Sequence, residues 1–249
     1  MRKVHYHSML TMTLAMVSLF FAVGQVHSQT KEGTWLAMAT QKSDYFLGEI
    51  VSLKFTIGNG SDSTLTIEPP SVERGSLRLY ISEDGEKYRE YIGPDWGLTE
   101  GRSKSQLELK PGDQFETGGM MLFNYKVPTF HLTESYAQEI RSERIDTDYA
   151  LSKAGRYYLK VVLDSPHTKT RIESKPVELL VSEPVREDGI AWEILRSNPA
   201  SAFFLHAGEL PVEEKSAKQL RADLTDILER YPKCIYAERI KENLDRLSR

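Results

Sequence analysis

The sequence predicts a mainly β protein in which an antiparallel β-sandwich is followed by a small α-helical C-terminal unit. Two observations lead to this prediction. Up to about residue 183, short segments of alternating apolar and polar residues recur between turn signals, which is typical of sandwiches. From residue 187 onward the apolar residues recur every three or four positions, which is typical of helices. We therefore place the sandwich at residues 30–183 and the helical unit at residues 187–249.

The clearest strand signal lies in residues 45–59, where a Gly-Glu turn precedes a strictly alternating run. Side chains at alternate positions share one face of a strand, so this run is expected to be a half-buried strand that a second sheet must cover. Its expected core face comprises Val51, Leu53, Phe55 and Ile57.

Turn signals separate the other expected strands. The Asp-Gly pair at residues 84–85 predicts a hairpin that joins residues 77–82 to 87–92. Gly118 and Gly119 predict a bulge or a close backbone approach in the strand at 115–125. The remaining expected strands are 35–39, 64–67, 107–109, 155–163 and 177–181.

An insertion at residues 129–152 interrupts this pattern. Tyr136, Ile140 and Arg144 fall on one helical face, so one or two helical turns are expected over residues 134–145. A connection of this length inside a compact sandwich indicates a functional or a mobile segment.

Proline residues divide the helical unit. The first expected helix buries Ile190, Ile194 and Leu195, with Trp192 beside them, and ends at Asn198 and Pro199. A second helix is expected over residues 200–207, and a third carries an apolar stripe that ends before Pro232. The last helix carries Ile235, Ile240, Leu244 and Leu247.

The first 28 residues are expected to form a cleaved export signal. A basic start precedes an apolar run at residues 9–23, and Val26, His27 and Ser28 precede a cleavage point before Gln29. No other apolar run is long enough to span a bilayer, so we expect no stable membrane insertion after cleavage. The single cysteine cannot form an intramolecular disulfide, which favours a bacterial periplasmic or extracellular protein.

The charge balance argues against a nucleic-acid partner. The chain has a formal net charge of −4, and loss of Arg2 and Lys3 with the signal makes it −6. Nucleic-acid binding depends on the neutralisation of phosphates by basic side chains. We therefore expect no nucleic-acid partner.

The residue types that carry catalysis are scattered in this sequence. His131, His167 and His206 lie apart from one another and from Cys234, without a nucleophile elbow or metal-ligand spacing. At a helix start, Cys234 is either a serine-like cap or a thiol whose pKa the helix dipole lowers. The carboxylates at 146 and 148 are expected to lie in a solvated acidic loop. A catalytic pair of carboxylates remains an open alternative, because the distance between two carboxylates depends on the fold. We predict no enzyme activity, no metal and no cofactor.

Aromatic residues in the loops are the better candidates for binding. Trp96, Phe130, Tyr136 and Tyr149 are our candidate partner-binding residues, since loops at the end of a sandwich often hold ligands. The alternative is that these rings close the open ends of the sandwich core.

Several short motifs carry resemblances to known families. Residues 47–49, 109–113 and 154–157 make the β region resemble bacterial immunoglobulin-like modules. That resemblance implies that the Tyr157 hydroxyl bonds backbone upstream of it, as in a tyrosine corner. The same features are weakly similar to the bacterial intracellular proteinase inhibitor family, from which the export signal and the insertion depart. Residues 228–237 resemble the helix junction of a tetratricopeptide-like hairpin.

The sequence thus favours an exported, non-enzymatic protein of the bacterial envelope or medium. We expect it to contact a partner protein through loops at the end of the sandwich and through the helical tail. One alternative is a proteinase inhibitor that uses a projecting loop of the sandwich. A further alternative is a carbohydrate-binding accessory domain that uses the loop around Trp96.

Overall fold

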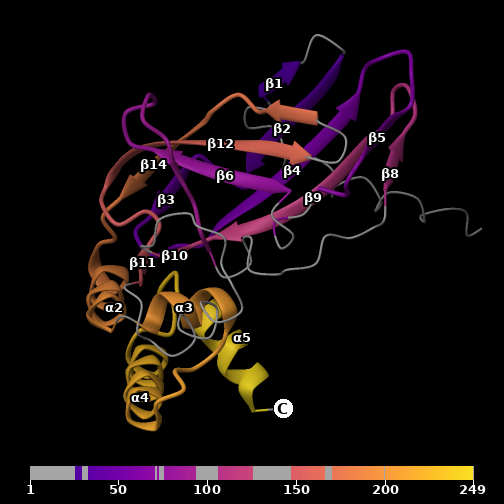
Figure 1. Cartoon of the computed structure of the whole chain (residues 1–249). Helices are drawn as coiled ribbons and strands as arrows, with labels where there is room; N and C mark the ends of the chain where they lie inside the picture. The colour runs from indigo at the N-terminus through magenta and orange to yellow at the C-terminus, as the bar shows by residue number, and fades with distance from the viewer. Residues whose placement is uncertain are drawn as a thin grey trace, which may run out of the picture.

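The computed structural model (Figure 1) describes residues 26–29, 33–70, 72, 76–93, 106–125, 147–165, 170–198 and 200–248. Strands occupy the first part of the chain, which we call the β unit (residues 26–182). Helices occupy the helical unit (residues 186–248) and gather at one end of the sheets. This β-rich fold followed by helices confirms the expected order of elements.

Two larger sheets form most of the β unit. One has the order β1-β2-β4-β9, formed by β1 (Val26–Gln29), β2 (Thr34–Thr40), β4 (Val51–Asn59) and β9 (Gln114–Met121). The other has the order β3-β14-β12-β6-β7, with β13 also paired to β12. Its strands are β3 (Asp44–Phe46), β6 (Leu77–Ser82), β7 (Arg89–Glu90), β12 (Gly155–Ser165), β13 (Thr170–Glu173) and β14 (Val177–Ser182).

Two short ribbons complete the described strands. One pairs β5 (Leu65–Ile67) with β8 (Leu107–Leu109), and the other pairs β10 (Phe123–Tyr125) with β11 (Thr147–Tyr149). The second ribbon lies beside the helices (Figure 1). Every described strand pair is antiparallel except the pairing of β3 with β14.

Side chains from both larger sheets share one apolar core. Leu36 and Phe55 from the first sheet and Leu79 and Leu159 from the second belong to the same buried cluster. Burial of such side chains is the main favourable term in folding, at roughly 1.5–3 kcal/mol each. The two sheets therefore stabilise each other across this core.

The stretch at residues 45–59 divides between the two sheets. Tyr45 and Phe46 belong to β3, and the alternating run forms β4, whose predicted core face is fully buried. The expectation of a polar opposite face is wrong at the end of β4, where Thr56 and Gly58 are also buried. The Trp35 indole covers Gly58 so closely that a Cβ there would lie 2.2 Å from it.

Three local predictions are confirmed. The Asp84 carboxylate accepts the N–H groups of Glu86 and Lys87 in the hairpin turn, and these bonds lower its pKa to about 2. The Tyr157 hydroxyl donates to the Lys153 carbonyl at 2.9 Å, as a tyrosine corner does. At Gly118 the structure shows the close approach and no bulge, because the pairing with β4 continues unbroken through it.

Four short strands were not expected, namely β1, β3, β11 and β13. Strand β1 includes Ser28 and Gln29, so cleavage at the predicted point would divide it. Strand β11 lies within the predicted insertion, and Ala150 and Leu151 after it are buried in the core. The end of the predicted insertion is thus part of the fold, whereas the helical turns expected over 134–145 lie outside the described residues.

The helices are α2 (Arg186–Ser197), α3 (Ala200–Ala207), α4 (Glu214–Arg230) and α5 (Ala237–Leu247). Their order confirms the predicted breaks. Two details differ: α2 buries Ala191 and Trp192 and leaves Ile190 47% exposed, and Ile235 lies in the turn before α5. None of the helices in the described ranges is both long and apolar enough to cross a membrane.

Replacement of Leu53 by alanine tests the core face of β4. Leu53 is 4% exposed, so Leu53→Ala should lower the free energy of unfolding by about 2–5 kcal/mol. The neighbouring Ser52 points to the opposite, exposed face, and Ser52→Ala should change it by less than about 0.5 kcal/mol. Urea denaturation measures both, and equal midpoints for the two variants would contradict the assignment.

Candidate binding site at the junction of the two units

The loop at residues 47–50 connects the two larger sheets. Its conformation is fixed by Glu49, whose Oε2 accepts the Phe46 N–H at 3.0 Å and whose Oε1 pairs with Lys42 at 2.5 Å. The Leu47 N–H donates to the Ser182 carbonyl at the end of β14. The loop is therefore bonded both to itself and to the six-stranded sheet.

Gly48 in this loop lies directly against Trp192 of α2. Its φ of +75° is a conformation that favours glycine, and a Cβ there would lie 2.5 Å from the Trp192 ring. Trp192 is 4% exposed and makes an edge contact with Tyr149, with ring centroids 4.7 Å apart. It also stacks near Tyr236, with centroids 6.4 Å apart. Only a residue without a side chain allows α2 to approach so closely.

Tyr236 fixes the turn before α5 to the same loop. Its hydroxyl donates to the Leu47 carbonyl at 2.6 Å, and both groups are buried. Burial raises the pKa of Tyr236 strongly, and the nearby Tyr149, Asp188 and Glu49 raise it further. The hydroxyl thus keeps its proton and remains a donor.

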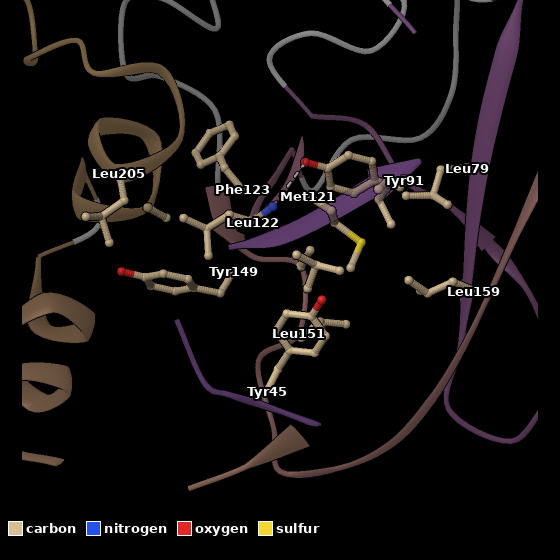
Figure 2. Packing of buried hydrophobic residues seen from close by; sticks show 14 of the residues in the cluster. Tyr45, Leu79, Tyr91, Met121, Leu122, Phe123, Tyr149, Leu151, Leu159 and Leu205 are labelled. Carbon is tan, nitrogen blue, oxygen red and sulfur yellow. Dashed lines mark hydrogen bonds between the residues drawn. The ribbon is translucent and has the colours of Figure 1, made fainter. Parts of the chain in front are cut away.

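The ribbon of β10 and β11 forms a second contact between the units. The Phe123 ring of β10 meets the Phe203 ring of α3 edge-on, with centroids 5.3 Å apart. Figure 2 shows Phe123 and Tyr149 on the side of the core that faces Leu205 of α3, away from Leu79 and Leu159. The β-strand residues on both sides of 126–146 are therefore held against the helical unit.

An open cleft of about 410 Å³ lies at this junction. The start of β4 and the end of β9 form one wall, and α3 and α5 with the preceding turn form the other. Its lining residues are Gln41, Gly48, Glu49, Ile50, Ser52, Met120, Leu205, Ile235, Tyr236, Glu238, Arg239 and Glu242. Within the described part of the chain, this cleft is our candidate binding site.

Of the four candidate residues predicted from the sequence, the structure places one. Tyr149 is 8% exposed and packs on Trp192, the position expected of a ring that closes the core. Trp96, Phe130 and Tyr136 lie outside the described residues. Most of the loop around Trp96 that the carbohydrate-binding alternative needs lies there as well.

Cys234 is buried, and it is not the N-cap residue of α5, which is Tyr236. Burial raises its pKa, and Asp188 and Glu187 add to that rise. The N–H groups of Tyr236 and Ala237 bond the sulfur and partly offset it. The idea that the helix dipole gives this thiol a lowered pKa is therefore wrong.

The described residues contain no group of three His, Cys, Asp or Glu side chains that could hold a metal ion. His206 is buried in α3, whereas His131 and His167 lie outside the described ranges.

The residues that build the junction were not singled out from the sequence as a site. Gly48 belonged to a turn motif, Trp192 to a helix and Tyr236 to a helix junction. Only contacts between units far apart in the chain bring these three together.

No protein-family model matches the chain, and no curated protein is detectably similar to it in sequence. Solved structures similar to it include Spo0M, a sporulation control protein from Bacillus subtilis, at 11% identity and a TM-score of 0.33, over 70% of this chain and 56% of that one. The CARDB domain of a Pyrococcus furiosus protein, in complex with di-metal ions, has 9% identity and a TM-score of 0.28, over 69% and 100% of the two chains.

A β-glucosidase from Listeria innocua has 12% identity and a TM-score of 0.30, over 61% of this chain and 17% of that enzyme. This chain thus spans about half of Spo0M and a small part of the glucosidase. Structural similarities this weak support no inference about the activity or the ligands of this chain.

Replacement of Gly48 by alanine tests the contact with Trp192. The positive φ alone should cost about 1–2 kcal/mol, and the clash with the indole should add about 1–3 kcal/mol. Gly112 is a matched control, because its φ is +85° but a Cβ there would meet nothing within 4 Å. Urea denaturation should show a larger loss for Gly48→Ala than for Gly112→Ala, and equal losses would contradict the contact.

Replacement of Tyr236 by phenylalanine tests the bond to Leu47. The unpaired buried carbonyl should lower the free energy of unfolding by about 1–3 kcal/mol at pH 7. The raised pKa of Tyr236 also predicts a pH effect. Above about pH 10 the unfolded chain has lost a proton that the folded protein keeps, so stability falls as pH rises. Denaturation from pH 8 to 11 should show a shallower fall for Tyr236→Phe, and an unchanged slope would contradict this assignment.

Proposed function

We propose that this chain is an exported, non-enzymatic binding protein of the bacterial envelope or medium. It contacts a partner protein through the end of the β unit that carries residues 126–146 and through the adjacent helical unit. The observation that carries this proposal is the junction itself. Helices α2, α3 and α5 pack against the ribbon and loop at one end of the sheets and form an open cleft there.

The proposal includes a finer assignment of the fold. Two facing sheets with the bond from Tyr157 to Lys153 support an immunoglobulin-like sandwich. Such scaffolds commonly present binding loops at their ends. The turn between α4 and α5, which resembles a tetratricopeptide junction, acts in this proposal as a docking hairpin on the sandwich.

A pull-down from envelope and medium fractions tests the function. The bait begins at residue 26, so that β1 is complete. In a second bait, a short Gly-Ser linker replaces residues 129–146 and leaves β11 intact. Such a linker can close the ribbon, because Tyr125 and Thr147 are paired across it.

A partner captured by the first bait and lost or weakened with the second supports the proposal. A partner retained by both supports binding through the helical unit alone. Loss of cooperative unfolding in the second bait would mean that the segment is needed for folding. Failure of the first bait to capture any partner at low or physiological salt would contradict the proposed function.

A further inference from the structure

The junction cleft is lined by both apolar and charged side chains. Its apolar lining includes Ile50 and Met120, which are partly buried, and Ile235, which is 37% exposed, whereas Leu205 and Tyr236 are almost fully buried. Glu238 and Glu242 are exposed and lie one helical turn apart on α5. A ligand in the cleft therefore meets both apolar side chains and carboxylates.

The cleft lining carries an excess of negative charge. Three glutamates and one arginine line the cleft, namely Glu49, Glu238, Glu242 and Arg239. Asp188 lies close by, since its carboxylate accepts the Ile235 N–H at 2.9 Å. The carboxylates of Asp188 and Glu49 also contribute to the raised pKa of Tyr236.

The neighbouring cations are already engaged. The Arg239 guanidinium donates to the carbonyls of Leu205 and His206, each at 2.8 Å, and lies 3.7 Å from Glu242. Lys42 pairs with Glu49. Glu238, which also lines the cleft, makes no ion pair with a described residue.

Glu238 and Glu242 lie one turn apart on α5, and the ion pair that Glu242 makes on this helix, with Arg239, is a long one at 3.7 Å. A carboxylate in the first turn, such as that of Glu238, is favoured by the helix dipole, but this effect fades by the next turn, where Glu242 lies. Like charges four residues apart on a helix are destabilising by a few tenths of a kcal/mol. A cation bound between them would remove this repulsion.

We propose that the cleft binds a cationic peptide segment of a partner protein. A lysine or arginine side chain lies with its aliphatic stem on Ile50 and Met120 and its charged head between Glu238 and Glu242. Lysine and arginine are suited to such a site because they combine an apolar stem with a charged end. The volume lies in the range of about 300–1,000 Å³ that is typical of ligand sites, and its open form admits a segment of chain.

This inference rests on the proposed function in one respect, namely that the partner is a protein. It does not need residues 126–146, because every residue that lines the cleft lies in the described part of the chain.

Fluorescence anisotropy with three dye-labelled peptides tests the inference directly. One peptide alternates leucine and lysine, the second leucine and arginine, and the third leucine and glutamate. The protein is the chain from residue 26 onward. The lysine and arginine peptides should bind, with an affinity that falls as salt rises, and the glutamate peptide should not.

Charge reversal in the cleft provides the matched comparison. The double variant Glu238→Lys with Glu242→Lys should weaken binding of the cationic peptides about tenfold or more, since like charges then face each other. The control double variant is Glu209→Lys with Glu229→Lys. It makes the same change in net charge at exposed positions outside the cleft lining and should bind within about twofold of wild type.

Three results would overturn the cleft assignment: no binding of either cationic peptide, equal binding of the glutamate peptide, or equal weakening by both double variants. These results are distinct from failure of the proposed function. If the pull-down captures a partner and the peptides do not bind, the partner contacts another surface. If the peptides bind and no partner is captured, the cleft assignment stands and the proposed function fails.

Discussion

The hydrogen bond from Tyr236 to the Leu47 carbonyl, together with the contact of Gly48 with Trp192, determines how the two units are joined. The same loop takes the chain from the six-stranded sheet to the four-stranded sheet, since β3 ends at Phe46 and β4 begins at Val51. One short loop therefore sets both the crossover between the sheets and the docking surface for the helices. A side chain at Gly48 would disturb both, which explains why a residue with no Cβ stands at this position.

The apolar core continues through the junction. One cluster of buried side chains extends from the sheets through Phe123 and Tyr149 into Trp192 and the helices. Among the described residues, the buried Trp192 indole N–H has no hydrogen-bond acceptor. The ring is held there by its packing on Tyr149 and Tyr236. The helical unit is thus held by the same kind of packing that holds the sheets together.

Long periodic elements were predictable from the sequence, and short ones were not. Strand β4 and helix α4 each repeat their pattern several times, so periodicity located them to within a few residues. Strands β3, β11 and β13 have only three or four residues, which is too short for alternation to show, and their pairing partners hold them in place. In α2, spacing alone favoured Ile190, and contacts with Gly48 and Tyr149 buried Trp192 instead.

The candidate site could not be predicted from local motifs, because its residues come from both ends of the chain. Glu49 and Glu242 line the same cleft although almost 200 residues separate them, a distance that no spacing rule spans. Tyr236 lines this cleft and also donates the bond that joins the units. A ligand held there contacts both units at once and therefore binds only their docked form. Ligands that bind one form of a protein stabilise that form, so occupation of the cleft and docking of the helices must strengthen each other.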